Sequence, residues 1–326
     1  LSFNILSRSI RQYSRKTMPI YPHFSTFQTR FQLRRSCRAG FTLVELMMVV
    51  VVLGLLTAIL IPALGGISSK GRATEELGGA RAAVAAWQSY AIDRDGELIK
   101  GYYPDSDPST EPLYDFNGNL IAPAPTQERW FWRLAPYLED PKRVFYPKAL
   151  ETVRRELIDV PDHQYSATIH PAFGLNGEWF GGLGDSLTNP LYAIYEYGDL
   201  ERRPWKKNLS DIRNTGKLIV FASSRFGSTD NNGGGGYLPG ITEGFHRIES
   251  PCAATNGYRW ATTDNGTVLS TMTDNPAEHG YVSARHSGKA VTAMADGSTR
   301  LESLTDIGDM RRWADDAWKR DWVLVP

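Results

Sequence analysis

The 326-residue sequence contains only two cysteines, Cys37 and Cys252. A framework of several disulfides is therefore excluded, and the fold has to depend on a hydrophobic core. Acidic residues are absent from residues 1–40, which contain eight Arg and Lys residues. The rest of the chain has 28 basic and 36 acidic residues, a net charge of −8. This balance opposes a nucleic-acid-binding role, because such binding depends on basic neutralisation of phosphates.

Several sequence patterns that carry chemistry are also missing. There is no Gly-x-Ser-x-Gly nucleophile elbow, and no two of the six histidines have the His-x3-His spacing of a zinc site. The four-glycine run 233–236 is not followed by the Lys-Ser or Lys-Thr of a phosphate loop. We therefore predict a non-enzymatic protein and expect the glycine run to form a surface loop.

The longest apolar stretch is 41–64, in which Glu45 is the only charged residue among 24. At about 1.5 Å per helical residue, it is long enough to cross a hydrocarbon core about 30 Å thick. Four arginines precede it: Arg30, Arg34, Arg35 and Arg38. An excess of basic residues keeps that side in the cytoplasm, so we predict a single-pass segment with the remainder of the chain facing outward.

The junction Arg38-Ala39-Gly40-Phe41-Thr42-Leu43-Val44-Glu45, followed by this apolar run, resembles the processing site of type IV pilins and type II secretion pseudopilins. The resemblance implies that prepilin peptidase cleaves after Gly40 and methylates the new N-terminal Phe41. Residues 1–40 would then be a leader, of 23 residues if Met18 is the initiator. The alternative is an uncleaved single-pass anchor.

Glu45 requires a partner, because an ionised group inside an apolar membrane helix is costly. We expect none within its own helix. Cleavage before Phe41 would create a protonated α-amine four residues away. The resemblance implies that Glu45 pairs with this amine of a neighbouring subunit and so sets the stagger of a filament. The alternative is that Glu45 reaches the membrane interface.

Pro62 interrupts the backbone hydrogen bonds of a helix, so we predict a kink or local melting there. A plain helix end is the alternative. The pattern then predicts an amphipathic helix over 65–92, because five apolar residues share one face through spacings of three and four. These residues are Leu77, Ala80, Val84, Trp87 and Ala91. Most of the charged residues from Arg72 to Arg81, with Glu76 among them, are expected elsewhere on the helix.

Residues 93–326 are long enough for one large head domain. Prolines break its first part into turns and extended segments. Residues 130–138 predict a short helix, and 217–222 predict a buried strand. The fold class is therefore α+β. The resemblance implies a pilin-like arrangement in which a long N-terminal helix packs on an antiparallel sheet with long loops.

Near the C-terminus, His286 is followed after nine residues by Asp296 and Gly297. Asp-Gly between two strand-like segments favours a type I′ hairpin turn, which would place Met294 opposite Thr299. The pattern also resembles a C-terminal signature of pilin-like proteins abundant in planctomycetes and related bacteria. The resemblance does not define the role of the histidine, and we expect His286 to bond backbone groups of its loop.

No cofactor is expected. Calcium prefers clustered oxygens, and the resemblance to secretion pseudopilins draws attention to carboxylates near this hairpin. The candidate ligands are Asp296, Asp306 and Asp309, or Asp230 with Asn231 and Asn232. Three tryptophans that follow, Trp313, Trp318 and Trp322, are expected to anchor a final helix in the core.

Together these features predict a structural subunit of a type II secretion pseudopilus or type IV pilus-like filament. Its expected partners are prepilin peptidase, like or related pilin-type subunits and an inner-membrane assembly platform. Its expected location is the bacterial inner membrane, with the N-terminus in the cytoplasm and the head periplasmic or extracellular. The alternative is a membrane-tethered binding module, such as an adhesin, that is exported by the same route without polymerising.

Overall fold

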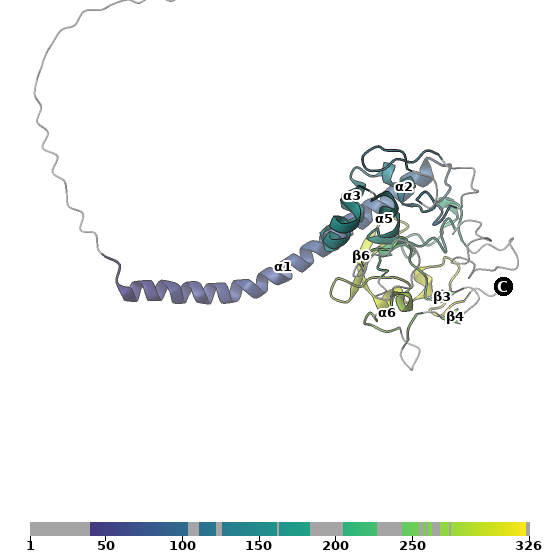
Figure 1. Ribbon diagram of the computed structural model, residues 1–326. Coiled ribbons are helices and arrows are strands. Elements are labelled where there is room, and N and C mark those ends of the chain that lie inside the picture. The colour runs from purple at the N-terminus through teal and green to yellow at the C-terminus, as the bar shows by residue number, and fades with distance from the viewer. Residues whose placement is uncertain are drawn as a thin grey trace, which may run out of the picture. The chain divides into compact units, whose positions relative to one another are not determined.

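The computed structural model describes residues 40–103, 111–121, 126–161, 163–182, 205–226, 243–253, 257–258, 260–262, 268–273 and 275–323. The chain forms two compact units, 1–57 and 58–326. The C-terminal part of helix α1 (Leu43–Ile92) belongs to the second unit, together with the short helices and the sheet (Figure 1).

The helices that follow α1 are short. They are α2 (Phe131–Leu134), α3 (Pro141–Phe145), α4 (Glu151–Val153), α5 (His163–Ile169) and α6 (Leu304–Ile307). The 3₁₀ segments are η1 (Ala135–Tyr137), η2 (Lys148–Leu150), η5 (Leu209–Asp211), η6 (Pro276–His279) and η7 (Met310–Arg312), and η3 (Arg154–Ile158) is a π-helical turn. The short helix predicted over 130–138 is confirmed as α2 and η1.

Four strands form an antiparallel sheet in the order β1-β2-β5-β6. They are β1 (Phe173–Leu175), β2 (Ile219–Ser223), β5 (Lys289–Met294) and β6 (Thr299–Ser303). Strands β3 (Cys252–Ala253) and β4 (Gly257–Tyr258) form a separate pair. Every residue of β2 is buried, as predicted for this stretch. A long helix with an antiparallel sheet and further short helices confirms the α+β class.

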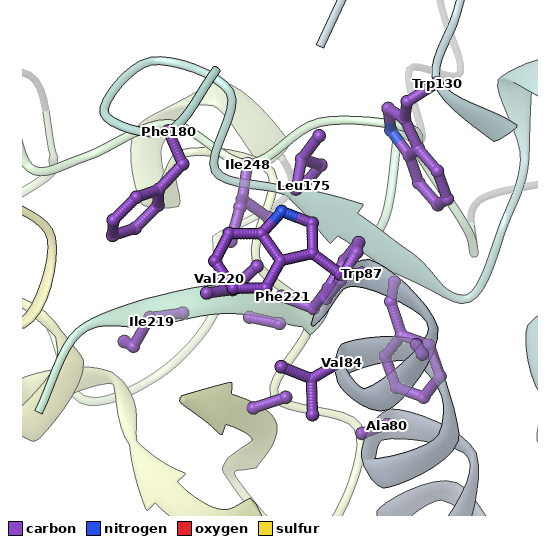
Figure 2. Packing of buried hydrophobic residues seen from close by; sticks show 14 of the residues in the cluster. Ala80, Val84, Trp87, Trp130, Leu175, Phe180, Ile219, Val220, Phe221 and Ile248 are labelled. Atoms are coloured by element: carbon purple, nitrogen blue, oxygen red, sulfur yellow. The ribbon is translucent and has the colours of Figure 1, made fainter. Parts of the chain in front are cut away.

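The C-terminal part of α1 carries the apolar face that its sequence predicts. Ala80, Val84, Trp87 and Ala91 are fully buried, and Leu77 packs against the same core at partial burial. Figure 2 shows Trp87 among side chains of β1 and β2, and its ring meets Phe180 edge to face at 6.1 Å. The helix therefore supplies one side of the core that the sheet completes.

The C-terminal hairpin is confirmed, but its predicted turn and register are wrong. Ala293, and not Met294, pairs with Thr299, and the Gly297 amide donates to the Met294 carbonyl. The loop therefore has three residues, and within the hairpin turn only Gly297 has a positive φ, at 87°. This is the pattern of a three-residue loop closed by a glycine bulge.

Tertiary contacts explain the longer loop. The Ala295 amide donates to Leu218, and the Ala295 carbonyl accepts from the side chain of Gln88 in α1. The Asp296 carboxylate accepts from the Ser298 amide, which stabilises the turn locally. Because Ala295 bonds both Leu218, the residue before β2, and Gln88 of α1, it becomes part of the turn, which the Asp-Gly pair alone does not indicate.

The backbone of α1 is helical through Pro62, so the alternative of a plain helix end at this residue is wrong. The kink at Pro62 stays a prediction. Among the described residues, no helix combines the length and the apolar character required to cross a membrane. The membrane-spanning segment predicted at 41–64 is thus not confirmed.

The predicted final helix is also wrong. Residues 313–323 contain only turns, bends and irregular backbone. Trp313 is nevertheless fully buried, and Trp322 packs on Trp179 at 5.7 Å, whereas Trp318 is 73% exposed. Two of the three tryptophans thus contact the core from irregular backbone. The run 233–236 and the residues Asp230, Asn231 and Asn232 lie outside the described residues.

Candidate functional site

The predicted processing junction leads directly into α1. Thr42 precedes the first helical residue, Leu43, and forms a capping box with Glu45. The Glu45 amide donates to the Thr42 hydroxyl at 3.2 Å, and the Thr42 amide and hydroxyl donate to the Glu45 carboxylate at 2.9 and 2.8 Å. The expectation that Glu45 has no partner in its own helix is therefore wrong. The Thr-x-x-Glu spacing was the signal that could have revealed it.

The side chains that follow this cap are apolar and exposed on every side of the helix. From Phe41 to Ile59, the large hydrophobic residues are between 47% and 77% exposed. A helix that is apolar all round is typical of a segment surrounded by lipid or by other apolar elements. Glu45 is the one carboxylate within it.

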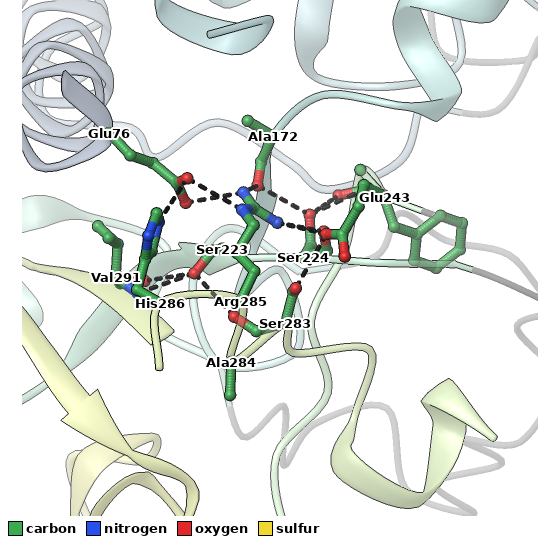
Figure 3. A network of polar contacts seen from close by, with 12 residues as sticks. Glu76, Ala172, Ser223, Ser224, Glu243, Ser283, Ala284, Arg285, His286 and Val291 are labelled. Carbon is green, nitrogen blue, oxygen red and sulfur yellow. Dashed lines mark hydrogen bonds and ion pairs between the residues drawn. The ribbon is translucent and has the colours of Figure 1, made fainter. Parts of the chain in front are cut away.

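A second polar site lies far from this cap along the chain, where α1 meets the segment before β5 (Figure 3). Glu76 lies on the buried face of α1, four residues before Ala80, and is 0% exposed. Its two carboxylate oxygens accept from the Arg285 guanidinium at 2.7 and 2.9 Å, and its Oε2 lies 2.8 Å from Nε2 of His286. From the sequence, most of the charged residues from Arg72 to Arg81 are expected away from the apolar face, so Glu76 was missed.

Arg285 is the hub of this site. Besides Glu76, it donates to the Glu243 carboxylate at 2.7 Å and to the backbone carbonyls of Ser224 and Ala172 at 3.0 and 2.9 Å. The five N–H groups of a guanidinium can all be satisfied by these bonds. Ser224 follows β2 and Ala172 precedes β1, so the side chain joins α1 to the ends of two strands.

His286 does not have the predicted partner. Its ring contacts the Glu76 carboxylate, whereas its backbone pairs with Lys289 around a two-residue loop. In this loop, Ser287 and Gly288 both have positive φ, at 54° and 77°, as a type I′ turn requires. The turn type predicted for Asp296 and Gly297 therefore occurs at the opposite end of β5.

The structure does not bring the ends of the motif together. His286 and Asp296 flank the six-residue strand β5, a separation of about 20 Å at strand rise. His286 joins the buried network on α1, while Asp296 caps the hairpin loop. A shared acid–base pair between them is therefore excluded by distance, and the two residues serve separate local structures.

The three carboxylates considered for calcium also belong to separate turns. Asp296 accepts from Ser298, Asp306 bonds Ser303 at the start of α6, and Asp309 is paired with Arg311. Within the described residues, no group of three His, Cys, Asp or Glu side chains is arranged to hold a metal ion. These contacts give each candidate carboxylate a local capping role.

The charge of Glu76 is stabilised within the fold. Burial by itself raises the pKa of this carboxyl, but the Arg285 charge and the hydrogen bonds from His286 and Arg285 outweigh burial, so the pKa lies below its ordinary value of 4.5. A carboxyl with a lowered pKa contributes stability above its ordinary pKa and loses that contribution as the pH falls through the folded-state value.

This linkage predicts an acid-sensitive fold. As the pH falls from about 6 to about 3, the free energy of unfolding is expected to decrease less for Glu76→Gln than for the wild-type chain. The reason is that the variant has no carboxylate to protonate in the network. Urea unfolding at a series of pH values measures this. The control is Glu75→Gln, at a half-buried position one residue away, which should follow the wild type. Identical pH slopes for Glu76→Gln and the wild type would contradict the prediction.

Comparison with known proteins bears on the N-terminal site. Residues 35–61 match the family described as the prokaryotic N-terminal methylation motif. This motif supports a type IV pilin-like or pseudopilin-like protein and indicates processing by prepilin peptidase. Comparisons with curated proteins and with solved structures gave no significant match. The resemblance recognised at the junction is confirmed.

Proposed function

We propose that this protein is a structural subunit of a type II secretion pseudopilus or a type IV pilus-like filament. The single observation that carries the proposal is the methylation motif at 35–61, joined to a helical segment whose apolar side chains are exposed on every side. In the membrane, segment 41–64 would cross the bilayer once, with the leader in the cytoplasm and the head outside the inner membrane. In the filament, the same segment would pack against the corresponding helices of like or related subunits.

The partners follow from this proposal. Prepilin peptidase would cut between Gly40 and Phe41, and an inner-membrane platform would extract the mature subunit from the bilayer. The Glu45 carboxylate would compensate the positive charge of the new α-amine of a neighbouring subunit, because an unpaired charge is costly in an apolar environment. The intrachain cap from Thr42 is compatible with this role, because a carboxylate can accept more hydrogen bonds than the two that Thr42 donates.

Processing is tested directly by the mass of the mature N-terminus. The protein isolated from membranes of its source cells is expected to begin with Phe41 carrying one additional methyl group on its amine. Intact-mass and N-terminal peptide analysis measure this, and Gly40→Leu, which alters the residue before the cut, is the control that should retain the leader. Wild-type protein that keeps residues before Phe41 would overturn the proposal.

The role of Glu45 is tested by separating its charge from its capping bond. Glu45→Gln keeps an acceptor for the capping box but has no charge to pair with an amine, whereas Glu45→Ala removes both. We expect both variants to insert into the membrane and both to form few filaments, counted by electron microscopy of sheared cell surfaces or of overproduced pseudopili.

Two other outcomes would contradict this expectation in different ways. Normal filaments with Glu45→Gln but not with Glu45→Ala would mean that the helix cap matters and the charge pairing does not. Processed wild-type protein that forms no filaments, alone or with related subunits, would favour the membrane-tethered binding module.

A further inference from the structure

The apolar face that α1 presents to the sheet consists mostly of small side chains. Its buried residues are Ala73, Ala80, Ala83, Val84, Ala86, Trp87, Tyr90 and Ala91. Alanines allow close packing, but two alanines that are one helical turn apart present nearly the same packing surface. A shift of α1 by one turn, about 5.4 Å, would therefore exchange similar surfaces along much of this face. Something other than the small side chains has to specify the position of the helix.

Besides the large buried side chains of Trp87 and Tyr90, two further features of α1 are not interchangeable in this way. Glu76 makes a directional, two-oxygen contact with Arg285, and one-turn shifts would bring Arg72 or Ala80 to its place. Gly79 provides a steric condition, because a Cβ at this position would lie 3.1 Å from the Val144 carbonyl oxygen of α3. A shift would put Glu75 or Ala83 there, and α3 would have to move away by a few tenths of an ångström to make room for the added Cβ.

The other side of the contact is rigidly held. Arg285 is 9% exposed and is fixed by backbone carbonyls at the ends of β1 and β2, in addition to the Glu243 carboxylate. His286 approaches the same carboxylate from the tight loop that opens β5. The partner of Glu76 is thus set by the sheet itself and does not depend on a flexible surface side chain.

We propose that Glu76, Arg285 and His286 are positioning residues that fix the axial position and rotation of α1 on the head. Buried ion pairs are weak sources of net stability compared with apolar residues of the same volume, and their better-supported use is to specify one arrangement among several. This gives His286, the residue of the C-terminal motif with no assigned role, a definite one. Its consequence for assembly rests on the proposed filament function, because a filament that packs through α1 places its heads according to how α1 is attached.

The proposal is tested by measuring the position of α1 relative to the head in the purified full chain in detergent. Nitroxide labels at Arg81→Cys on the exposed side of α1 and at Trp318→Cys on the head report this distance by pulsed electron resonance, in a background without Cys37. With the network intact, the distance between the two labels is expected to show one narrow distribution. Glu76→Gln is expected to broaden it or to add a second distance displaced by up to about one helical turn, 5.4 Å. Glu75→Gln is the matched control and should leave the distribution unchanged.

A second variant guards against simple unfolding. The pair Glu76→Leu/Arg285→Met replaces the ion pair with apolar side chains and is expected to fold, yet to show the same broadened distribution. A single unchanged distance in both Glu76→Gln and the apolar pair would overturn the proposal, because the network would then affect stability alone. The measurement needs no filaments, so its outcome is independent of whether the filament function holds. Filament counts for the folded apolar pair, expected to fall at least tenfold, test the consequence for assembly separately.

Discussion

Arg285→Met is expected to lower the free energy of unfolding by about 3 to 5 kcal/mol. The substitution keeps most of the side-chain volume but leaves the 0% exposed Glu76 carboxylate without its cation. It also removes the bonds to Ser224 and Ala172, whose carbonyls lie at strand ends. Removing one member of a buried pair costs more than the pair contributed, because the remaining charge stays buried and uncompensated. Urea unfolding of the full chain, followed by tryptophan fluorescence, measures the loss.

The control for this prediction is an arginine with the same kind of partner at the surface. Arg311 pairs with Asp309 at 2.6 Å, but its side chain is 55% exposed. Arg311→Met is expected to cost less than about 1 kcal/mol, since exposed ion pairs contribute little. Adding Glu76→Leu to Arg285→Met should recover most of the loss, because the apolar pair leaves no buried charge. Equal losses for Arg285→Met and Arg311→Met would show that the network is not closed to water.

Gly174→Ala is expected to cost about 3 kcal/mol, the upper end of what overpacking usually costs. A Cβ at Gly174, in the middle of β1, would lie 2.5 Å from both the carbonyl carbon and the oxygen of Arg247. These are backbone atoms, and the residues on either side of Arg247, residues 246 and 248, are hydrogen-bonded to the backbone of Leu175. The segment therefore cannot move away from β1 without losing these hydrogen bonds. A backbone displacement therefore adds to the steric cost. Thermal melts of the full chain measure the effect.

Gly78→Ala is the matched control, as the same chemical change in α1. No atom lies within 4 Å of a Cβ at Gly78, so the added methyl group meets open space. Alanine also favours helix over glycine, so this variant should be more stable than the wild type by about 0.5 to 1 kcal/mol. Opposite signs for the two glycines are the expected result. A destabilised Gly78→Ala would mean that this part of α1 is covered by something not seen in the single chain.

At the C-terminal motif, the sequence predicts the hairpin but not the length of its loop. The Asp-Gly pair correctly predicts a hairpin, because Gly297 alone supplies the positive φ that the loop needs. It does not determine the loop length, which depends on hydrogen bonds from Ala295 to Leu218 and from Gln88 to Ala295. The residues that bond in these two contacts are at least 77 positions apart in the chain, so no local pattern could indicate them.

Glu76 shows the same limit in another form. Its spacing of four from Ala80 and seven from Ala83 places it on the buried face, and that spacing was available in the sequence. A buried glutamate is nevertheless unfavourable unless it is paired, and its partner Arg285 lies 209 residues further along. Without knowledge of that partner, a position away from the apolar face was the prediction that a charged residue favours.

The sequence by itself determined the features that depend on neighbouring residues. These are the methylation motif at 35–61, the apolar face of the C-terminal part of α1, the buried strand β2 and the existence of the C-terminal hairpin. Such features follow from periodicity, composition and turn preferences within a few residues. Only the tertiary structure decided that Glu76, Arg285 and His286 meet, because their proximity results from how the helix packs on the sheet. The physical reason is that a buried charge is tolerated only where distant parts of the chain supply its partner.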